Sequence, residues 1–144
     1  RRQVDFINIR SFLRVKRLGR GFDFLEELLL PYGKLDITFY NDLIDQPYEQ
    51  LVADLTHSFY DGIIVQGVED FIRDGNSTTF ERLMDNHLLD YLRAAKANPF
   101  GIEPILGYLL AKENEIKLIR IIMVGKINNI PTEKIRERLR DVYV

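Results

Sequence analysis

Apolar residues recur at helical spacing through most of the chain, and short polar or glycine- and proline-containing breaks separate the segments. From 2 to 19, apolar side chains cover much of a helix circumference, and Arg10, Arg14 and Arg17 fall on one narrow stripe. A helix that is apolar around most of its girth is typical of a buried one. The arginine stripe is therefore predicted to be its only hydrated or paired edge. Gly19 and Gly21 end this helix.

Five further helices are predicted before residue 100, at 22–30, 36–45, 47–55, 58–74 and 77–97. The segment 36–45 is expected to be helical although several of its residues favour strands. Gly62 and Gly67 interrupt the fourth, and we expect them to mark close approach to a neighbouring helix. Ser77 is predicted to cap the fifth.

The C-terminal third predicts one long helix and one short one. The long helix runs from about 102 to 126, with Glu113 and Lys117 placed as an i, i+4 ion pair. Its apolar side consists of Ile105, Leu109, Ile116, Ile119, Met123 and Ile127. The last helix begins at Pro131 and Thr132. It is expected to turn Ile135 and Leu139 inward and Arg136, Arg138 and Arg140 outward. Since every segment is predicted to be helical, the fold class is all-α, and we expect one domain over 1–144.

A shift of 110 residues brings parts of the chain into register with each other. The matched positions are Ile9-Arg10 with Ile119-Arg120, Leu13 with Met123, Lys16 with Lys126, Gly19 with Asn129, Leu25 with Ile135 and Leu29 with Leu139. Each copy is a long helix ending in a basic residue, a break and a short amphipathic helix. Two similar amphipathic hairpins could also match by chance. The coincident arginine, lysine and break positions favour a true repeat.

The formal net charge of −2 hides three separate charge fields. Residues 1–35 carry a net +4, residues 36–90 a net −10, and residues 91–144 a net +4. Separated fields of this kind indicate docking surfaces for charged partners. Alternatively, the two basic segments pack beside the acidic one, and the sequence leaves both interpretations open.

Residues that could carry chemistry are few. The chain has no cysteine and only two histidines, His57 and His87, which excludes disulfides, thiolate catalysis and histidine-rich metal sites. Nucleophile-elbow and phosphate-loop motifs are absent. The carboxylates of Asp42, Asp45, Glu49 and Asp54 lack calcium-loop spacing and are interpreted as solvated helix edges. The sequence therefore predicts no catalytic residue, no metal site and no cofactor.

The basic stripe raises the question of nucleic acid. Arg10, Arg14 and Arg17, with Lys16 and Arg20, could contact phosphates. The protein is acidic overall and this helix is mostly apolar, so pairing with acids of the middle segment or with a protein partner is favoured. No apolar run approaches the roughly 18 residues that a membrane span needs.

Two stretches carry a family resemblance. Residues 107–144, GYLLAKENEIKLIRIIMVGKINNIPTEKIRERLRDVYV, resemble the C-terminal signature of the C subunit of the archaeal and bacterial A/V-type ATPases. The eukaryotic relative is the d subunit of the vacuolar proton pump. Residues 5–35, DFINIRSFLRVKRLGRGFDFLEELLLPYGKL, are similar to the equivalent element of the preceding repeat in that family.

The resemblance implies a funnel-shaped, all-α body built from three helical repeats. About 1–100 would hold the end of one repeat and the start of the last, and about 101–144 the C-terminal hairpin. The sequence begins at Arg1 and not at a methionine, which we interpret as a C-terminal fragment.

The implied function is that of a non-catalytic rotor subunit. It would be peripheral to the membrane at the cytoplasmic face and would link the central-stalk subunits to the proteolipid ring. It would thereby couple ATP hydrolysis or synthesis to proton or sodium transport. Expected docking residues, each of which could instead form an intramolecular salt bridge, are Arg10, Arg14, Arg17, Lys112, Glu113, Arg120 and Lys126. The alternative is a generic α-solenoid interaction scaffold.

Overall fold

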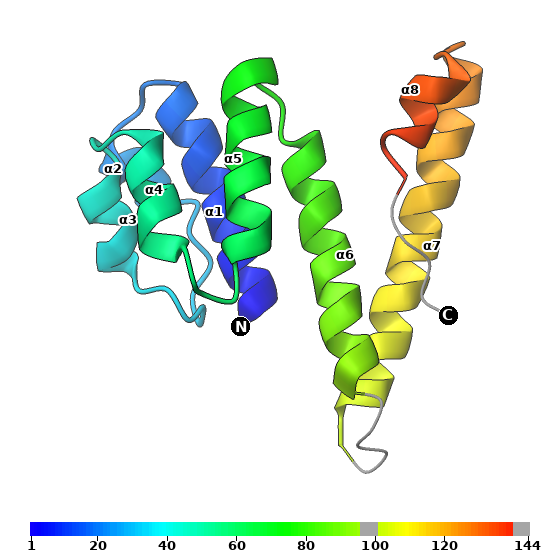
Figure 1. Cartoon of the computed structure of the whole chain (residues 1–144), viewed down its shortest axis with the longest axis horizontal. Coiled ribbons are helices and arrows are strands. Elements are labelled where there is room, and N and C mark those ends of the chain that lie inside the picture. Colours follow the sequence, from blue (N-terminus) through cyan, green and yellow to red (C-terminus); the bar gives the residue numbers. More distant parts are fainter. Residues whose placement is uncertain (96–100, 140–144) are drawn as a thin grey trace. The chain divides into compact units, whose positions relative to one another are not determined.

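A computed structural model describes residues 1–95 and 101–139 (Figure 1). Its helices are α1 (Arg2–Arg17), α2 (Phe22–Glu26), α3 (Ile37–Leu43), α4 (Tyr48–Leu55), α5 (Asp61–Asp74), α6 (Thr78–Ala95), α7 (Glu103–Ile127) and α8 (Thr132–Arg136). The described residues contain no strand, so the all-α prediction is confirmed. The predicted helix end at Ala97, the break at 98–100 and the outward side chain of Arg140 lie outside the described residues.

The chain forms two compact units, Arg1–Glu81 and Arg82–Val144. The first contains α1 to α5 and the start of α6, and the second contains the rest of α6 with α7 and α8. The expectation of one domain, divided near residue 100, stays a prediction.

Helix α1 lies at the centre of the first unit. Its apolar side chains Phe6, Ile9, Phe12 and Leu13 are at most 1% exposed. Phe6 meets the edge of the Tyr60 ring with centroids 5.3 Å apart, and Phe12 lies 6.0 Å from the Tyr40 ring. Such aromatic pairs stabilise a core beyond their buried area. The prediction that this helix is buried is confirmed.

A fully buried carboxylate fastens α1 to two other parts of the unit. Asp5 is 0% exposed, and its Oδ1 accepts hydrogen bonds from the backbone N–H groups of Lys34 (2.7 Å) and Leu35 (3.0 Å). Its Oδ2 accepts the hydroxyl of Tyr60 at 2.5 Å. Burial and this hydrogen bond raise the pKa of the Tyr60 hydroxyl well above its ordinary value. Burial likewise raises the pKa of Tyr40, and the nearby Asp5 carboxylate raises it further.

Helix α2 is shorter than the predicted 22–30, because the side chain of Asn8 binds the backbone that follows it. Asn8 Nδ2 donates to the Leu30 carbonyl at 2.9 Å, and the Leu30 N–H donates to Asn8 Oδ1 at 2.8 Å. Both backbone groups of Leu30 are thus satisfied outside a helix. From Glu27 onward the chain leaves the helix, which brings Leu30 within hydrogen-bond distance of Asn8.

Helix α5 approaches α6 at a glycine. A Cβ on Gly67 would lie 2.7 Å from Cδ2 and 3.3 Å from Cα of Phe80, whereas a Cβ on Gly62 would meet nothing within 4 Å. The expectation of close approach is therefore confirmed for Gly67 and wrong for Gly62. Ser77 directly precedes α6, and its hydroxyl donates to Glu81 at 2.8 Å, so that the predicted cap stays a prediction.

In the second unit, α7 buries its small residues. From residue 104 to its end, its buried positions are Gly107, Ala111, Asn114 and Gly125. Ile135 of α8 packs so closely that a Cβ on Gly125 would lie 2.7 Å from its Cδ1. Lys117 donates to Asp85 of α6 at 3.0 Å in place of the expected pairing with Glu113. Ile135 is 5% exposed, in agreement with its predicted inward position.

The two hairpins α1–α2 and α7–α8 match under the shift of 110 residues. Arg17 and Ile127 end the long helices, and the residues of α2 fall on those of α8. The breaks contain Gly19 (φ 63°) and Asn129 (φ 52°) in the left-handed region, which these two residue types adopt most readily. The Arg20 N–H bonds the Val15 carbonyl at 3.2 Å, and the Ile130 N–H bonds the Gly125 carbonyl at 2.9 Å. These coincidences support the duplicated hairpin, which stays a prediction.

The contrast between the two glycines of α5 gives a matched test. We expect Gly67→Ala to lower the free energy of unfolding by about 1–3 kcal/mol, because the added methyl group collides with Phe80. Gly62→Ala should raise it by up to about 1 kcal/mol, because alanine is the better helix former and the site is open. Urea denaturation of both variants measures the difference. Equal effects would contradict the close packing of α5 on Phe80.

The buried tyrosines predict a loss of stability in alkali. A raised folded-state pKa means that the contribution of Tyr60 is complete below about pH 10, the unfolded value, and is lost as pH rises from there towards the folded value. The free energy of unfolding should therefore fall above about pH 10. Tyr60→Phe should cost about 1 kcal/mol at neutral pH, through the lost hydrogen bond, and should make the alkaline fall shallower. Urea titrations at several pH values check this, and an unchanged slope would refute it.

Candidate docking surfaces

The arginine stripe of α1 contacts the ends of the helices around it. Arg10 Nη1 lies 3.4 Å and Arg14 Nη2 3.1 Å from Oε1 of Glu81, in the first turn of α6. Arg14 also donates to the hydroxyl of Ser77 at 2.7 Å, and that hydroxyl donates to Glu81 at 2.8 Å. Arg10 and Arg14 are thus held by an acid of the middle segment, one of the two partners that the sequence leaves open.

Arg17 and Lys16 bind the C-terminal ends of helices, whereas Arg10 and Arg14 bind the N-terminal turn of α6. Arg17 Nη1 donates to the Phe71 carbonyl at 3.1 Å, at the C-terminus of α5. Its guanidinium occupies the space that a Cβ on Gly75 would need. Lys16 Nζ donates to the carbonyls of Leu43 (3.4 Å) and Ile44 at the end of α3. Cations are favourable at helix C-termini, where carbonyls lack intrahelical partners. Burial lowers the pKa of Lys16, opposed by the nearby Asp45.

An open groove of about 700 Å³ lies where these contacts meet. The side chains of Arg14 and Arg17 line it, together with Phe71 and the first residues of α6. Arg14 keeps 54% of its side chain exposed beside the groove.

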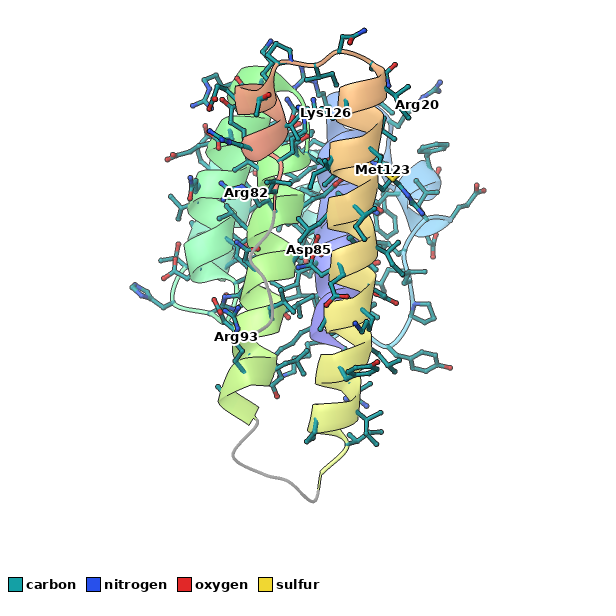
Figure 2. The ribbon with its side chains drawn as sticks, turned by 90° about the vertical axis from the view of Figure 1, so that its right-hand side faces the viewer. Arg20, Arg82, Asp85, Arg93, Met123 and Lys126 are labelled. Carbon is teal, nitrogen blue, oxygen red and sulfur yellow. The ribbon has the colours of Figure 1, made fainter. Side chains whose placement is uncertain are left out.

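The charged residues predicted on α7 are more exposed. Lys112 pairs with its helical neighbour Glu115 at 2.9 Å, which raises the pKa of Lys112, and its ammonium lies 5.8 Å from the centroid of the Tyr108 ring. Glu113 is exposed. Arg120 and Lys126 are exposed too, and within the described part of the chain neither has an ion-pair or hydrogen-bond partner. Figure 2 labels Lys126 near the end of α7 that carries α8.

A small basic pocket between α7 and α8 was not anticipated from the sequence. Its volume is about 210 Å³, and Arg120, Lys134 and Arg138 line it. The i, i+4 spacing of Lys134 and Arg138 was the signal that could have indicated it, because α8 then turns both cations to the same side.

The apolar side of α7 assigned from the sequence faces solvent. Ile105, Leu109, Ile116, Ile119, Met123 and Ile127 are all more than half exposed. The buried side is the opposite one, with the small residues. The glycine, alanine and asparagine at helical spacing were the signal for this, because close helix packing selects small side chains.

The described residues offer little chemistry beyond charge and packing. They hold no group of three or more histidine, aspartate or glutamate side chains placed to hold a metal ion. Asp42, Asp45, Glu49 and Asp54 are exposed, as expected of solvated helix edges. Among the described helices, none is long and apolar enough to cross a membrane. Whether any of the seven predicted docking residues contacts a partner stays a prediction.

Comparison with known proteins gives a family match over nearly the whole chain. The sequence profile described as "ATP synthase (C/AC39) subunit" matches residues 1–138. The C subunit of the A-type ATP synthase of Methanococcoides burtonii is 28% identical over 140 residues, which cover 96% of this chain and 39% of that protein. The C subunit of the V-type sodium ATPase of Enterococcus hirae is 39% identical over 61 residues, 42% of this chain and 19% of that protein. No solved structure matches.

Two charge reversals separate an anchoring arginine from an exposed one. Arg14→Glu places a carboxylate beside Glu81, and we expect it to lower the free energy of unfolding by about 1 kcal/mol, the scale of a partly exposed ion pair. Arg20→Glu makes the same charge change at an exposed position three residues beyond the helix and should cost less than about 0.5 kcal/mol. Thermal denaturation at low and high salt measures both. An Arg14→Glu variant as stable as wild type would show that Glu81 does not hold this arginine.

Proposed function

The chain belongs to the ATP synthase (C/AC39) subunit family, and we propose that it forms part of a non-catalytic coupling subunit of a rotary ATPase. In this role the subunit links the central stalk to the proteolipid ring of the membrane. It passes torque between ATP hydrolysis or synthesis and the transport of protons or sodium ions. It is peripheral to the membrane at the cytoplasmic face.

The observation that carries the proposal is the family match over residues 1–138. Relatives that align with nearly the whole chain are named as the C subunit of A-type ATP synthases. The chain spans about two fifths of the length of these relatives. The proposed role therefore concerns the longer protein, to which residues 1–144 contribute helices and surface.

The physical character of the chain supports a mechanical role. A coupler has to transmit force through stiff elements, and α7 is one helix of 25 residues, about 37 Å long. Helix ends in the first unit are fastened by side chains of α1, as Arg17 does for α5 and Lys16 for α3. Such fastening resists sliding of one helix past another.

The proposed contact with a partner subunit uses the exposed charges near the middle of α7. Lys112 and Glu113 are adjacent, exposed and opposite in charge. Exposed charges at an interface set the orientation and the association rate of two proteins more than their affinity. It suits a subunit that has to assemble in one register.

Co-purification tests the proposed function. The full-length protein carrying an affinity tag should retain stalk subunits and ring proteolipids when isolated from detergent-solubilised membranes. Retention of neither, under conditions that keep the rest of the rotary complex intact, would overturn the coupling role. A generic α-solenoid scaffold would then be the better description.

A matched pair of charge reversals tests the docking residues. Glu113→Lys should weaken retention of the stalk subunits by about three- to tenfold and leave the melting temperature within about 2 °C, because Glu113 is exposed. Glu49→Lys makes the same change at an exposed position of α4 and should leave retention unchanged. Equal retention by both variants would remove Glu113 from the docking surface without affecting the wider proposal.

A further inference from the structure

The small basic pocket between α7 and α8 draws its charged side chains from both parts of the hairpin. Helix α8 packs beside the C-terminal part of α7 (Figure 1), and the space between them has a volume of about 210 Å³. Arg120 lines the pocket from α7, Lys134 lines it from α8, and Arg138 lines it from the turn that follows α8. Every lining residue belongs to the second unit of the chain. We call this site the α7–α8 pocket.

Between the basic groups the walls of the α7–α8 pocket are apolar. They consist of Ile121, Val124, Gly125, Ile130 and Ile135. Gly125 is buried and Ile135 is 5% exposed, so this wall belongs to the closely packed part of the hairpin. Apolar walls lower the local dielectric constant, so an ion seated against them feels nearby charges more strongly than it would in bulk water. The pocket therefore suits a charged ligand held by a few groups.

Three positive charges surround this small space, and the chain supplies no acid to two of them. Neither Arg120 nor Lys134 has an ion-pair or hydrogen-bond partner within the described residues. The acid directly before Lys134, Glu133, lies 3.4 Å from Arg136 instead. Lys134 and Arg138 are spaced i, i+4, at which like charges on helical turns repel each other. The arrangement therefore costs stability until an anion enters the pocket.

The first hairpin shows that packing does not require these cations. The shift of 110 residues places Lys134 and Arg138 on Phe24 and Leu28, which are both apolar. The arginine of the long helix does have a basic counterpart, Arg10, and that side chain binds an acid at the start of α6. The two cations contributed by α8 and the turn after it are thus specific to the second hairpin.

We propose that the α7–α8 pocket binds a phosphate group through Arg120, Lys134 and Arg138. A phosphate monoester carries about 1.5 to 2 negative charges at neutral pH and presents three strong acceptor oxygens, enough to engage three cations. A carboxylate carries one charge on two oxygens and would leave part of the positive charge uncompensated. Guanidinium groups donate to phosphate through paired N–H groups, and an ammonium adds a compact charge.

The volume of the pocket limits how much of a ligand it holds. Sites for drug-sized molecules occupy about 300–1,000 Å³, and the α7–α8 pocket, at about 210 Å³, lies below that range. The pocket therefore holds the phosphate group and a few further atoms, and the rest of the ligand lies outside it. Two sources present the same chemistry, a soluble phosphate and the phosphomonoester headgroup of phosphatidic acid. This site does not depend on the coupling role.

Titration of the full-length protein with inorganic phosphate at constant ionic strength tests the proposal, with binding followed by phosphorus NMR line broadening. Lys134→Gln should weaken binding by about tenfold, the scale of one charge-assisted hydrogen bond. Arg136→Gln is the matched control, because it removes the same charge from the same helix at a residue that does not line the pocket. It should change binding by less than about twofold, since exposed charges outside the pocket are screened.

Thermal denaturation of the same proteins gives a second measurement. Without phosphate, Lys134→Gln should be at least as stable as the wild type, because one repulsive charge is removed. Phosphate should raise the melting temperature of the wild type and of Arg136→Gln more than that of Lys134→Gln, because a ligand that binds the folded state stabilises it. A Lys134→Gln variant that gains as much from phosphate as the wild type would overturn the proposal.

Vesicles distinguish the two sources of phosphate. If the ligand is the lipid headgroup, sedimentation with vesicles of equal parts phosphatidylcholine and phosphatidic acid should retain the wild type and Arg136→Gln, but much less of Lys134→Gln. A phosphate titration that depends on Lys134, without vesicle retention that depends on it, assigns a soluble phosphate.

Two results would overturn the site whatever the source. One is the absence of both saturable phosphate binding and vesicle retention, which would mean that another group of the full-length protein fills the pocket. The other is an equal response of the wild type, Lys134→Gln and Arg136→Gln in both assays, which would show only general attraction between basic and negative surfaces. Failure of co-purification would leave these results unaffected.

Discussion

A carboxylate withdrawn from water is stable only where hydrogen-bond donors replace the solvent it has lost, and this requirement organises the first unit of the chain. Asp5 is fully buried and is satisfied by two backbone N–H groups after α2 and by the hydroxyl of Tyr60 before α5. The three donors belong to two different segments, so both segments must be in place together. The requirement fixes the position of α1 against the loop at 34–35 and the start of α5, and the aromatic core around Phe6 depends on that position.

The basic side chains of α1 supply hydrogen-bond donors and positive charge to the ends of the neighbouring helices. Lys16 and Arg17 donate to carbonyls at the C-termini of α3 and α5, and Arg10 and Arg14 bind Glu81 at the start of α6. Part of the charge separation along the sequence is therefore neutralised within the fold. Of the two interpretations of the charge fields, packing of basic against acidic segments applies to this pair of arginines. Any docking role is left to the exposed edge of Arg14 and to the charges of α7.

Periodicity and break residues predicted every helix, including α3, whose strand-favouring residues are overridden by the Asp36 cap on the Thr38 N–H. The errors came from long-range contacts. The end of α2 depends on Asn8, which lies 22 residues from Leu30. The empty space at Gly62 and the Phe80 contact at Gly67 depend on how α5 crosses α6. The docking residues predicted on α1 and α7 stay predictions, and spacing could not show that Arg10, Arg14 and Arg17 already bind groups within the fold.

Helix α7 has two apolar sides of different kinds, and this difference bears on how force could pass through it. The side with Gly125 admits Ile135 of α8 at close range. The opposite side, around Ile119 and Met123, carries large side chains and is more than half exposed. A helix packed on one side curves gently around the core that it covers, convex towards solvent. A helix packed on both sides must disrupt a dense core to bend. In the proposed coupling role, the close packing of Ile135 on Gly125 opposes bending of α7 towards α8.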